Sequence, residues 1–303
     1  MGKKKTFVHN IILVNEMKSV KLYEEFKDIV YEKAQYYIED FDFDCDLTIY
    51  FKDTKKQNVS IDGEVEDARM TLIKRKPAIV IFSQALKDAR QHKGGLFYTL
   101  FHEFAHIYDY CKTMNNKYGK ANPMLKKQRT RKDFVISRGW EIWTEFYAYY
   151  LALKRYGKKF NGQTLMSFMK WYKNLKEKHK EFDKKLDEGN KVSSFKKEVE
   201  DYVESAERFV YHAARFMGAR VAGLVRRYNY SEKTEEQEDF QDVVTFFDEL
   251  GEKLCLMIKN PYGKTMDKKL FEIGKCVYEY FYFKLDISFV REDGIYKKLV
   301  GFQ

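Results

Sequence analysis

Proline and paired cysteine are scarce in this 303-residue chain, and long apolar runs are missing. Only three prolines occur, so little interrupts the formation of long helices. The four cysteines are far apart and form no Cys-x-x-Cys pair, which argues against a disulfide framework or a cysteine zinc knuckle. No segment reaches the roughly 20 apolar residues of a membrane span, and no secretory leader is visible. These absences predict a cytoplasmic protein with reduced thiols; an effector exported without a leader is the alternative.

Charge and apolar content define what the chain does have. A hydrophobic share of 44% is enough for a sizeable folded core. The net charge of +10 allows an acidic partner such as nucleic acid. Lysines are spread along helical faces with acidic residues between them, and this mixture favours a solvated surface over a dedicated nucleic-acid site. The sequence carries no signal for an oligomeric state.

The expected elements are mixed in the first half and helical in the second. Helices are predicted at 17–39, 83–89, 96–111 and 139–156, and strands at 46–52, 68–74 and 78–82, with a strand or loop at 59–64. Further helices are predicted at 165–186, 194–227, 238–258 and 267–285, followed by a hairpin of 287–291 and 295–299. We therefore expect an α+β domain over residues 1–157 and a helical domain over residues 158–303.

One short motif carries metal chemistry. The helix predicted at 96–111 contains His102-Glu103-Phe104-Ala105-His106, an HExxH pattern. Residues four apart share one face of a helix, so both imidazoles can bind one ion. Zinc accepts such nitrogen ligands, and catalytic zinc sites hold three protein ligands and a water. Glu103 adjoins the first ligand, where its carboxylate can accept a proton from that water. Two histidines that merely pack in a helix are the simpler reading, but the motif has the expected helical context.

A third ligand is needed, and the helix predicted at 139–156 offers two candidates. Glu141 and Glu145 are four apart on one face of a strongly aromatic helix. Acidic residues in such surroundings are costly unless they are paired or bind a metal. One of the two can bind zinc while the other accepts the N–H of a ligating imidazole.

These residues resemble a known class of peptidases. HExxH followed far downstream by Glu145-Phe146-Tyr147-Ala148 is similar to the gluzincins, and the second segment to the ligand helix of lethal-factor-type toxin peptidases. The element order also resembles ImmA/IrrE-type cytosolic peptidases. The resemblance implies a minimal zincin domain, Glu145 as the third ligand with Glu141 next, and 78–82 as the edge strand that receives the substrate. A tyrosine seven residues before the ligand in lethal-factor-type sites is here Arg138, a candidate oxyanion stabiliser.

Two further residues are candidates for supporting roles. Asp109 lies three residues after His106 and is expected either to orient an imidazole or to be an exposed acid at the helix end. His212 lies on a helical face with Arg208 and Arg215, opposite an apolar stripe. This trio either stabilises a tetrahedral intermediate or, more simply, covers a helix surface.

The sequence therefore predicts a zinc-dependent endopeptidase that acts on a protein substrate, with Glu103 as general base and His102, His106 and Glu145 as the metal ligands. The alternative is a regulatory or interaction protein. In that case the metal site would be structural, and the basic helical region would engage a protein or nucleic acid.

Overall fold

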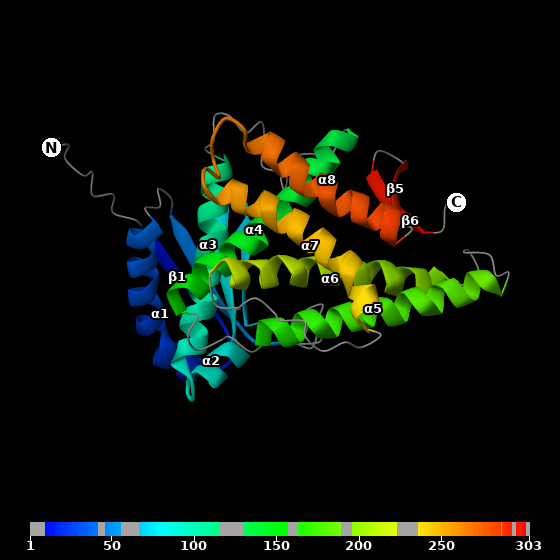
Figure 1. Ribbon diagram of the computed structural model, residues 1–303. Coiled ribbons are helices and arrows are strands. Elements are labelled where there is room, and N and C mark those ends of the chain that lie inside the picture. Colours follow the sequence, from blue (N-terminus) through cyan, green and yellow to red (C-terminus); the bar gives the residue numbers. More distant parts are fainter. Residues whose placement is uncertain are drawn as a thin grey trace. The chain divides into compact units, whose positions relative to one another are not determined.

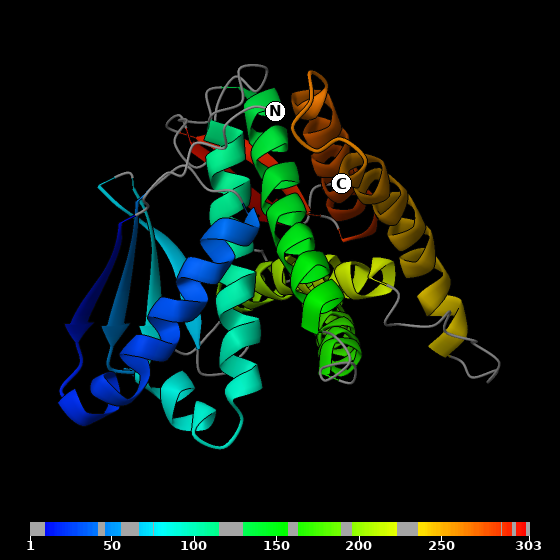
Figure 2. The same cartoon turned by 90° about the vertical axis from the view of Figure 1, so that its left-hand side faces the viewer.

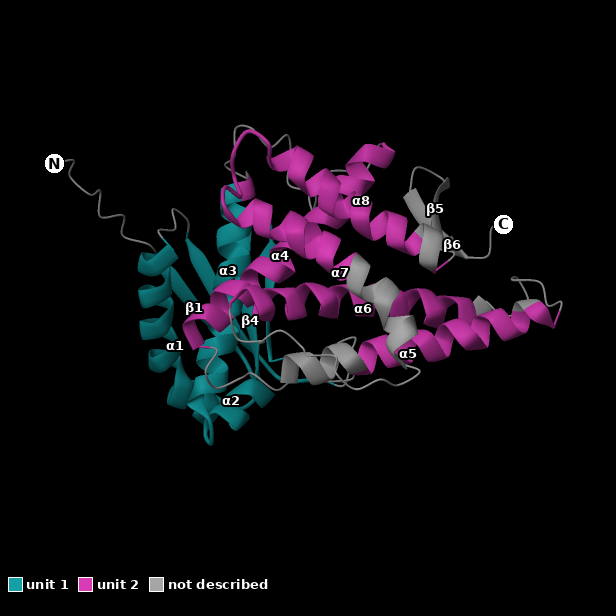
Figure 3. Ribbon diagram, viewed as in Figure 1, with its two compact units in different colours: residues 1–112 teal, residues 113–303 magenta. Residues whose placement is uncertain are grey.

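The computed structural model describes residues 10–41, 46–55, 67–74, 76–114, 130–156, 163–188, 196–222, 236–285, 287–292 and 295–300 (Figure 1). These residues form eight helices, a four-stranded sheet and a two-stranded sheet, which confirms the predicted α+β class. The chain divides into two compact units, residues 1–112 and 113–303 (Figure 3). No described helix is long and apolar enough to cross a membrane.

The first unit contains a mixed sheet with the strand order β1-β2-β4-β3. Its strands are β1 (Ile11–Glu16), β2 (Leu47–Lys52), β3 (Ala68–Ile73) and β4 (Lys76–Phe82). β1 pairs parallel to β2, β2 pairs parallel to β4, and β3 turns back antiparallel to β4. The three strands predicted from alternation are present, whereas β1 was not predicted. The predicted strand or loop at 59–64 lies outside the described residues.

The prediction that residues 78–82 form the edge strand of the sheet was wrong. β4 (Lys76–Phe82) has neighbours on both sides, and β3 is the outer strand among the strands that the structure describes. β4 is accordingly buried from its second residue to its last, as an internal strand should be. The Phe82 N–H donates to the Asp67 carbonyl at 3.0 Å, and this bond shows which residues of β3 point their backbone groups toward β4. Odd-numbered residues of β3 therefore bond to β4, and the backbone groups of Ala68, Met70 and Leu72 face the open edge, the side of β3 on which no other described strand pairs.

Helices cover one face of this sheet. α1 (Val20–Phe41) and α3 (Lys93–Met114) lie side by side against it, and the short α2 (Ser83–Ala89) precedes α3 (Figure 2). Tyr37 joins the two long helices, because its fully buried ring packs edge-on against Phe101 and Phe104. Its hydroxyl donates to the Phe97 carbonyl at 3.1 Å. This aromatic contact fixes the helix that carries the HExxH motif.

The second unit is helical, with one hairpin. Its elements are α4 (Arg131–Tyr156), α5 (Gln163–Asp187), α6 (Lys196–Val221), α7 (Glu236–Ile258), α8 (Met266–Lys284), β5 (Ile287–Glu292) and β6 (Ile295–Val300). α4 begins at a capping box, in which the Thr130 hydroxyl accepts from the Asp133 N–H and the Asp133 carboxylate accepts from the Thr130 N–H. The predicted C-terminal helices and hairpin are confirmed in order and approximate bounds.

The division between the units falls before α4, whereas the predicted domain boundary at residue 157 falls after it. The reason is packing: α4 lies against both α6 and α8 and shares their core. Two glycines permit the close crossing of α4 and α8. A Cβ at Gly139 would overlap the Leu270 carbonyl oxygen, and one at Gly274 would overlap the Val135 carbonyl oxygen. Periodicity within each helix cannot reveal such a partner.

Candidate metal centre

Two imidazoles approach each other on α3. His102 and His106 are one helical turn apart, and their Nε2 atoms lie 3.0 Å from each other. The helix is anchored by fully buried apolar neighbours, among them Phe104 and Ile107, so this face cannot turn away without exposing the core. His102 is buried and His106 half-buried. The predicted convergence of the two rings is therefore present.

The spacing of the two nitrogens suits a shared cation. Two ligand atoms at the usual zinc–nitrogen distance around a tetrahedral ion lie about 3.3 Å apart. The observed separation of the His102 and His106 Nε2 atoms, 3.0 Å, is close to that value. Without an ion, the two neutral imidazoles can share a hydrogen bond at this distance, with the donor set by their tautomers. When both Nε2 atoms are unprotonated, they present two lone pairs to one cation.

Glu103 points toward the sheet. The residue is only 7% exposed, and its Oε2 accepts a hydrogen bond of 2.5 Å from the Met70 N–H at the open edge of β3. A buried carboxylate needs such a donor to offset the loss of its hydration. The general-base candidate is thus tied to the outer strand of the sheet.

The second unit supplies the acidic candidates, and they differ sharply in environment. Glu145 is 4% exposed, whereas the side chain of Glu141 is 45% exposed. Glu141 forms an ion pair with Arg138 at 2.7 Å, and Arg138 also pairs with Glu207 at 3.0 Å. Arg138, the oxyanion candidate, is therefore already engaged by two carboxylates on the helix surface.

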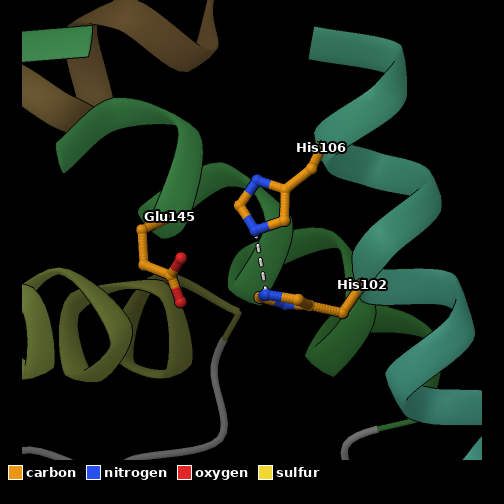
Figure 4. Close-up of side chains that lie close together, drawn as sticks. All are labelled: His102, His106 and Glu145. Carbon is orange, nitrogen blue, oxygen red and sulfur yellow. Dashed lines mark hydrogen bonds between the residues drawn. The ribbon is translucent and has the colours of Figure 1, made fainter. Parts of the chain in front are cut away.

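Glu145 belongs to a group that can hold a metal ion. One ring nitrogen each from His102 and His106 and one carboxylate oxygen of Glu145 lie within 4.8 Å of one another (Figure 4). Figure 4 shows the three side chains converging from their helices. Two imidazoles and a carboxylate form a donor set that suits zinc and related divalent ions. The side-chain chemistry thus fits a divalent metal, and it leaves the identity of that metal open.

Arg215 on α6 holds the carboxylate of Glu145. Its Nε donates to Glu145 Oε1 at 2.7 Å, and its Nη2 donates to the Tyr211 hydroxyl at 2.6 Å. Desolvation raises the pKa of Tyr211 well above its usual value, so the phenol keeps its proton at neutral pH. In the sequence, Arg215 is recognisable only as part of a helix face with Arg208 and His212. No local pattern links it to a residue 70 positions earlier.

The remaining candidates have definite positions. Asp109 is fully buried in the interior of α3, so the alternative of an exposed acid at the helix end was wrong. His212 is 3% exposed and stacks on Trp171 with ring centroids 5.6 Å apart, so it does not belong to a helix surface. Arg208 lies over the same indole ring at 4.9 Å.

Comparisons with protein-family models, curated proteins and solved structures give no match.

Proposed function

We propose that this protein is a metal-dependent endopeptidase that uses zinc and acts on a protein substrate. The observation that carries the proposal is the convergence of two helical imidazoles and the buried carboxylate of Glu145. Glu103 follows the first of these histidines in the chain. The HExxH arrangement of the sequence and its resemblance to gluzincins support peptide hydrolysis as the task of these residues. We also propose that the first unit has the architecture of a zincin domain.

The residues have separate tasks in this proposal. His102, His106 and Glu145 would hold the ion, which supplies a polarised water and a Lewis acid for the carbonyl group. Glu103 accepts the proton of the attacking water and delivers it to the leaving amine. A carboxylate suits this task because it can accept a proton and release it again within one reaction cycle.

The open edge of β3 supports a protein substrate. Ala68, Met70 and Leu72 direct their N–H and carbonyl groups away from the sheet, where an extended peptide can add as another strand. The hydrogen bond between Met70 and Glu103 places the base beside this edge. A peptide that pairs with β3 would therefore run past the carboxylate that activates the water.

Metal content tests the centre itself. Purified wild-type protein is expected to hold close to one equivalent of zinc, and His106→Ala and Glu145→Ala are expected to lose it. Glu141→Ala is the matched control, because it removes a carboxylate from the same helix at an exposed position. Equal zinc in all four proteins would contradict the assigned ligands.

Peptidase activity needs its own test. Wild-type protein and Glu103→Gln are incubated with a denatured proteome, and the new amino termini are mapped by mass spectrometry. Cleavage is expected with the wild type and not with the variant. Zinc-loaded wild-type protein that generates no new termini from denatured or native proteomes would contradict the hydrolase proposal.

A second candidate function has one observation in its favour. The 2.5 Å hydrogen bond from Met70 gives Glu103 a structural task that needs no catalysis. In a regulatory or interaction protein, the metal would brace the fold and the basic helical region would contact a protein or nucleic acid. The Glu103→Gln variant distinguishes the two functions. A regulatory or interaction protein that carries this substitution would keep its biological effect with zinc bound, whereas a peptidase would lose its biological effect.

A further inference from the structure

A guanidinium group is clamped next to the proposed third ligand. Arg215 lies between two tyrosine rings, with its Cζ 4.2 Å from the centroid of Tyr211 and 5.0 Å from that of Tyr149. From this position its Nε donates to Glu145 Oε1 at 2.7 Å. All four residues belong to α4 and α6, so the arrangement depends only on how these two helices pack.

We infer that Arg215 is a positioning residue for the metal: it holds the carboxylate of Glu145 in a fixed orientation and thereby sets the affinity of the site. The inference rests on the metal centre of the proposed function. The Nε–H of Arg215 donates to Oε1 of Glu145 and so fixes the orientation of this carboxylate. A partner that orients a ligand in this way adds to metal affinity because the ligand no longer has to be ordered when the ion binds.

The close approach of α4 and α6 makes the clamp short and stiff. Gly218 lies one turn after Arg215, and a Cβ there would meet the Phe146 carbonyl oxygen at 2.9 Å and the Tyr150 nitrogen at 3.0 Å. Any larger side chain would therefore push the two helices apart. The backbone contact next to Glu145 keeps the carboxylate within reach of Arg215, while the two stacked rings remove most of the freedom of the arginine side chain.

Two opposing effects decide the sign of the contribution. A guanidinium repels a divalent cation, which would weaken binding, but it also orders the carboxylate, which strengthens binding. The side chain of Arg215 is 23% exposed, so water screens part of the repulsion, whereas Glu145 is almost fully buried and gains the full benefit of its partner. We therefore expect the ordering effect to exceed the repulsion.

The test measures zinc affinity, by competition with a chromophoric chelator. Arg215→Ala and Arg215→Gln are expected to bind zinc about 10- to 100-fold more weakly than the wild type, the range typical of lost outer partners. Arg215→Lys restores the charge but not the planar group that donates from Nε and Nη2 together, so a partial recovery is expected. Tyr211→Phe removes one of the two bonds of Arg215 and should give a smaller loss.

Arg220→Ala is the matched control. It removes a positive charge from the same helix, where the side chain is 43% exposed and pairs loosely with Asp248 at 3.5 Å. Its zinc affinity should equal that of the wild type. Far-ultraviolet circular dichroism and thermal unfolding of each zinc-free variant show whether it is folded, and Arg215→Gln retains most of the packing volume if Arg215→Ala does not fold.

The outcomes separate this inference from the proposed function. Wild-type affinity in folded Arg215→Gln and Arg215→Ala, or tighter binding than the wild type, would overturn the role of Arg215 and leave the metal centre intact. If the Arg215 variants bind zinc more weakly than the wild type but the wild type cleaves no peptide, the positioning role of Arg215 would be supported and the peptidase function would be overturned. A wild-type protein that binds no zinc would remove both.

Discussion

The Met70 N–H on the outer strand of the sheet donates to Glu103 Oε2 at 2.5 Å. This contact joins the general-base candidate to the strand on which we expect the substrate to pair. The Met70 N–H that donates to Glu103 is also a group that would donate to a carbonyl oxygen of an added peptide strand. Binding of an extended peptide would then release the carboxylate oxygen toward the attacking water.

Two substitutions at Glu103 separate catalysis from structure. Glu103→Gln keeps a carbonyl oxygen that can accept from the Met70 N–H but cannot accept the proton of the water. Its peptidase rate should fall at least about 100-fold with unchanged unfolding. Glu103→Ala also leaves the Met70 N–H unpaired, which should destabilise the protein by about 1–3 kcal/mol. Urea unfolding and a fluorogenic peptide assay measure the two effects; equal stability of both variants would contradict the structural role.

Removal of the metal should lower the stability of the folded protein, and this effect should require the histidine and glutamate ligands. Zinc at about 100 times its dissociation constant stabilises the folded state by about 2.7 kcal/mol if the unfolded chain does not bind it. Chelation should therefore reduce the melting temperature of the wild type, and zinc should restore it. His106→Ala should show no such response. A wild type that melts at one temperature with and without chelator, at a zinc content of one equivalent, would show that binding is not coupled to folding.

The crossing of α4 and α8 should not tolerate a methyl group. Gly139→Ala and Gly274→Ala each place a Cβ into a carbonyl oxygen of the opposing helix, and we expect a loss of about 1–3 kcal/mol or more. Gly95→Ala is the contrasting case, because a Cβ there meets nothing within 4 Å. It lies in the first turn of α3 and should be neutral or gain up to about 1 kcal/mol. Thermal unfolding ranks the three variants, and an unchanged Gly274→Ala would show that the helices separate easily.

Cys276 should resist alkylation in the folded protein. Burial, with the nearby carboxylate of Glu249 as a smaller cause, raises the pKa of its thiol from 9.0 to about 12. Iodoacetamide reacts with the thiolate, so at pH 8 the labelling of Cys276 should be at least about 100-fold slower than that of an exposed cysteine. Peptide mass spectrometry with and without guanidinium gives the two rates.

The same raised pKa predicts a pH dependence of stability. Between about pH 9 and pH 12 the folded chain holds a proton on Cys276 that the unfolded chain releases, so stability should decline as the pH rises through this window. Cys276→Ala should lose that part of the decline. A wild-type curve that matches the variant curve would contradict the raised pKa.

Helical periodicity predicted most of the fold because each long helix has an apolar face, as the positions of Phe26 and Val30 in α1 illustrate. Alternation predicted β2, β3 and β4, but not their order, since the pairing of strands is set by contacts between distant residues. β1 was missed because its apolar run, from Ile11 to Val14, is short and has no alternation that separates it from other apolar segments.

The candidate site was predictable where it depends on spacing within one helix. The four-residue interval of His102 and His106 determines their common face, and the same interval left Glu141 and Glu145 equivalent. Their burial distinguishes them, and burial depends on helices far along the chain. The link between Glu145 and Arg215 has the same origin, because it requires the packing of α4 on α6.

The outer position of β3 has a consequence for how the chain tolerates insertions and deletions. Successive amides of a strand point in opposite directions, so the amide that reaches Glu103 is selected by the length of the tight connection to β4, not by the methionine side chain. That connection includes Lys74, whose φ of 52° lies in the left-handed region. Replacing Met70 by another residue with a backbone N–H preserves the contact, whereas a shift of β3 by one residue along β4 would bring the amide of a neighbouring residue opposite Glu103 and would move the side chains of β3 to the opposite faces of the sheet.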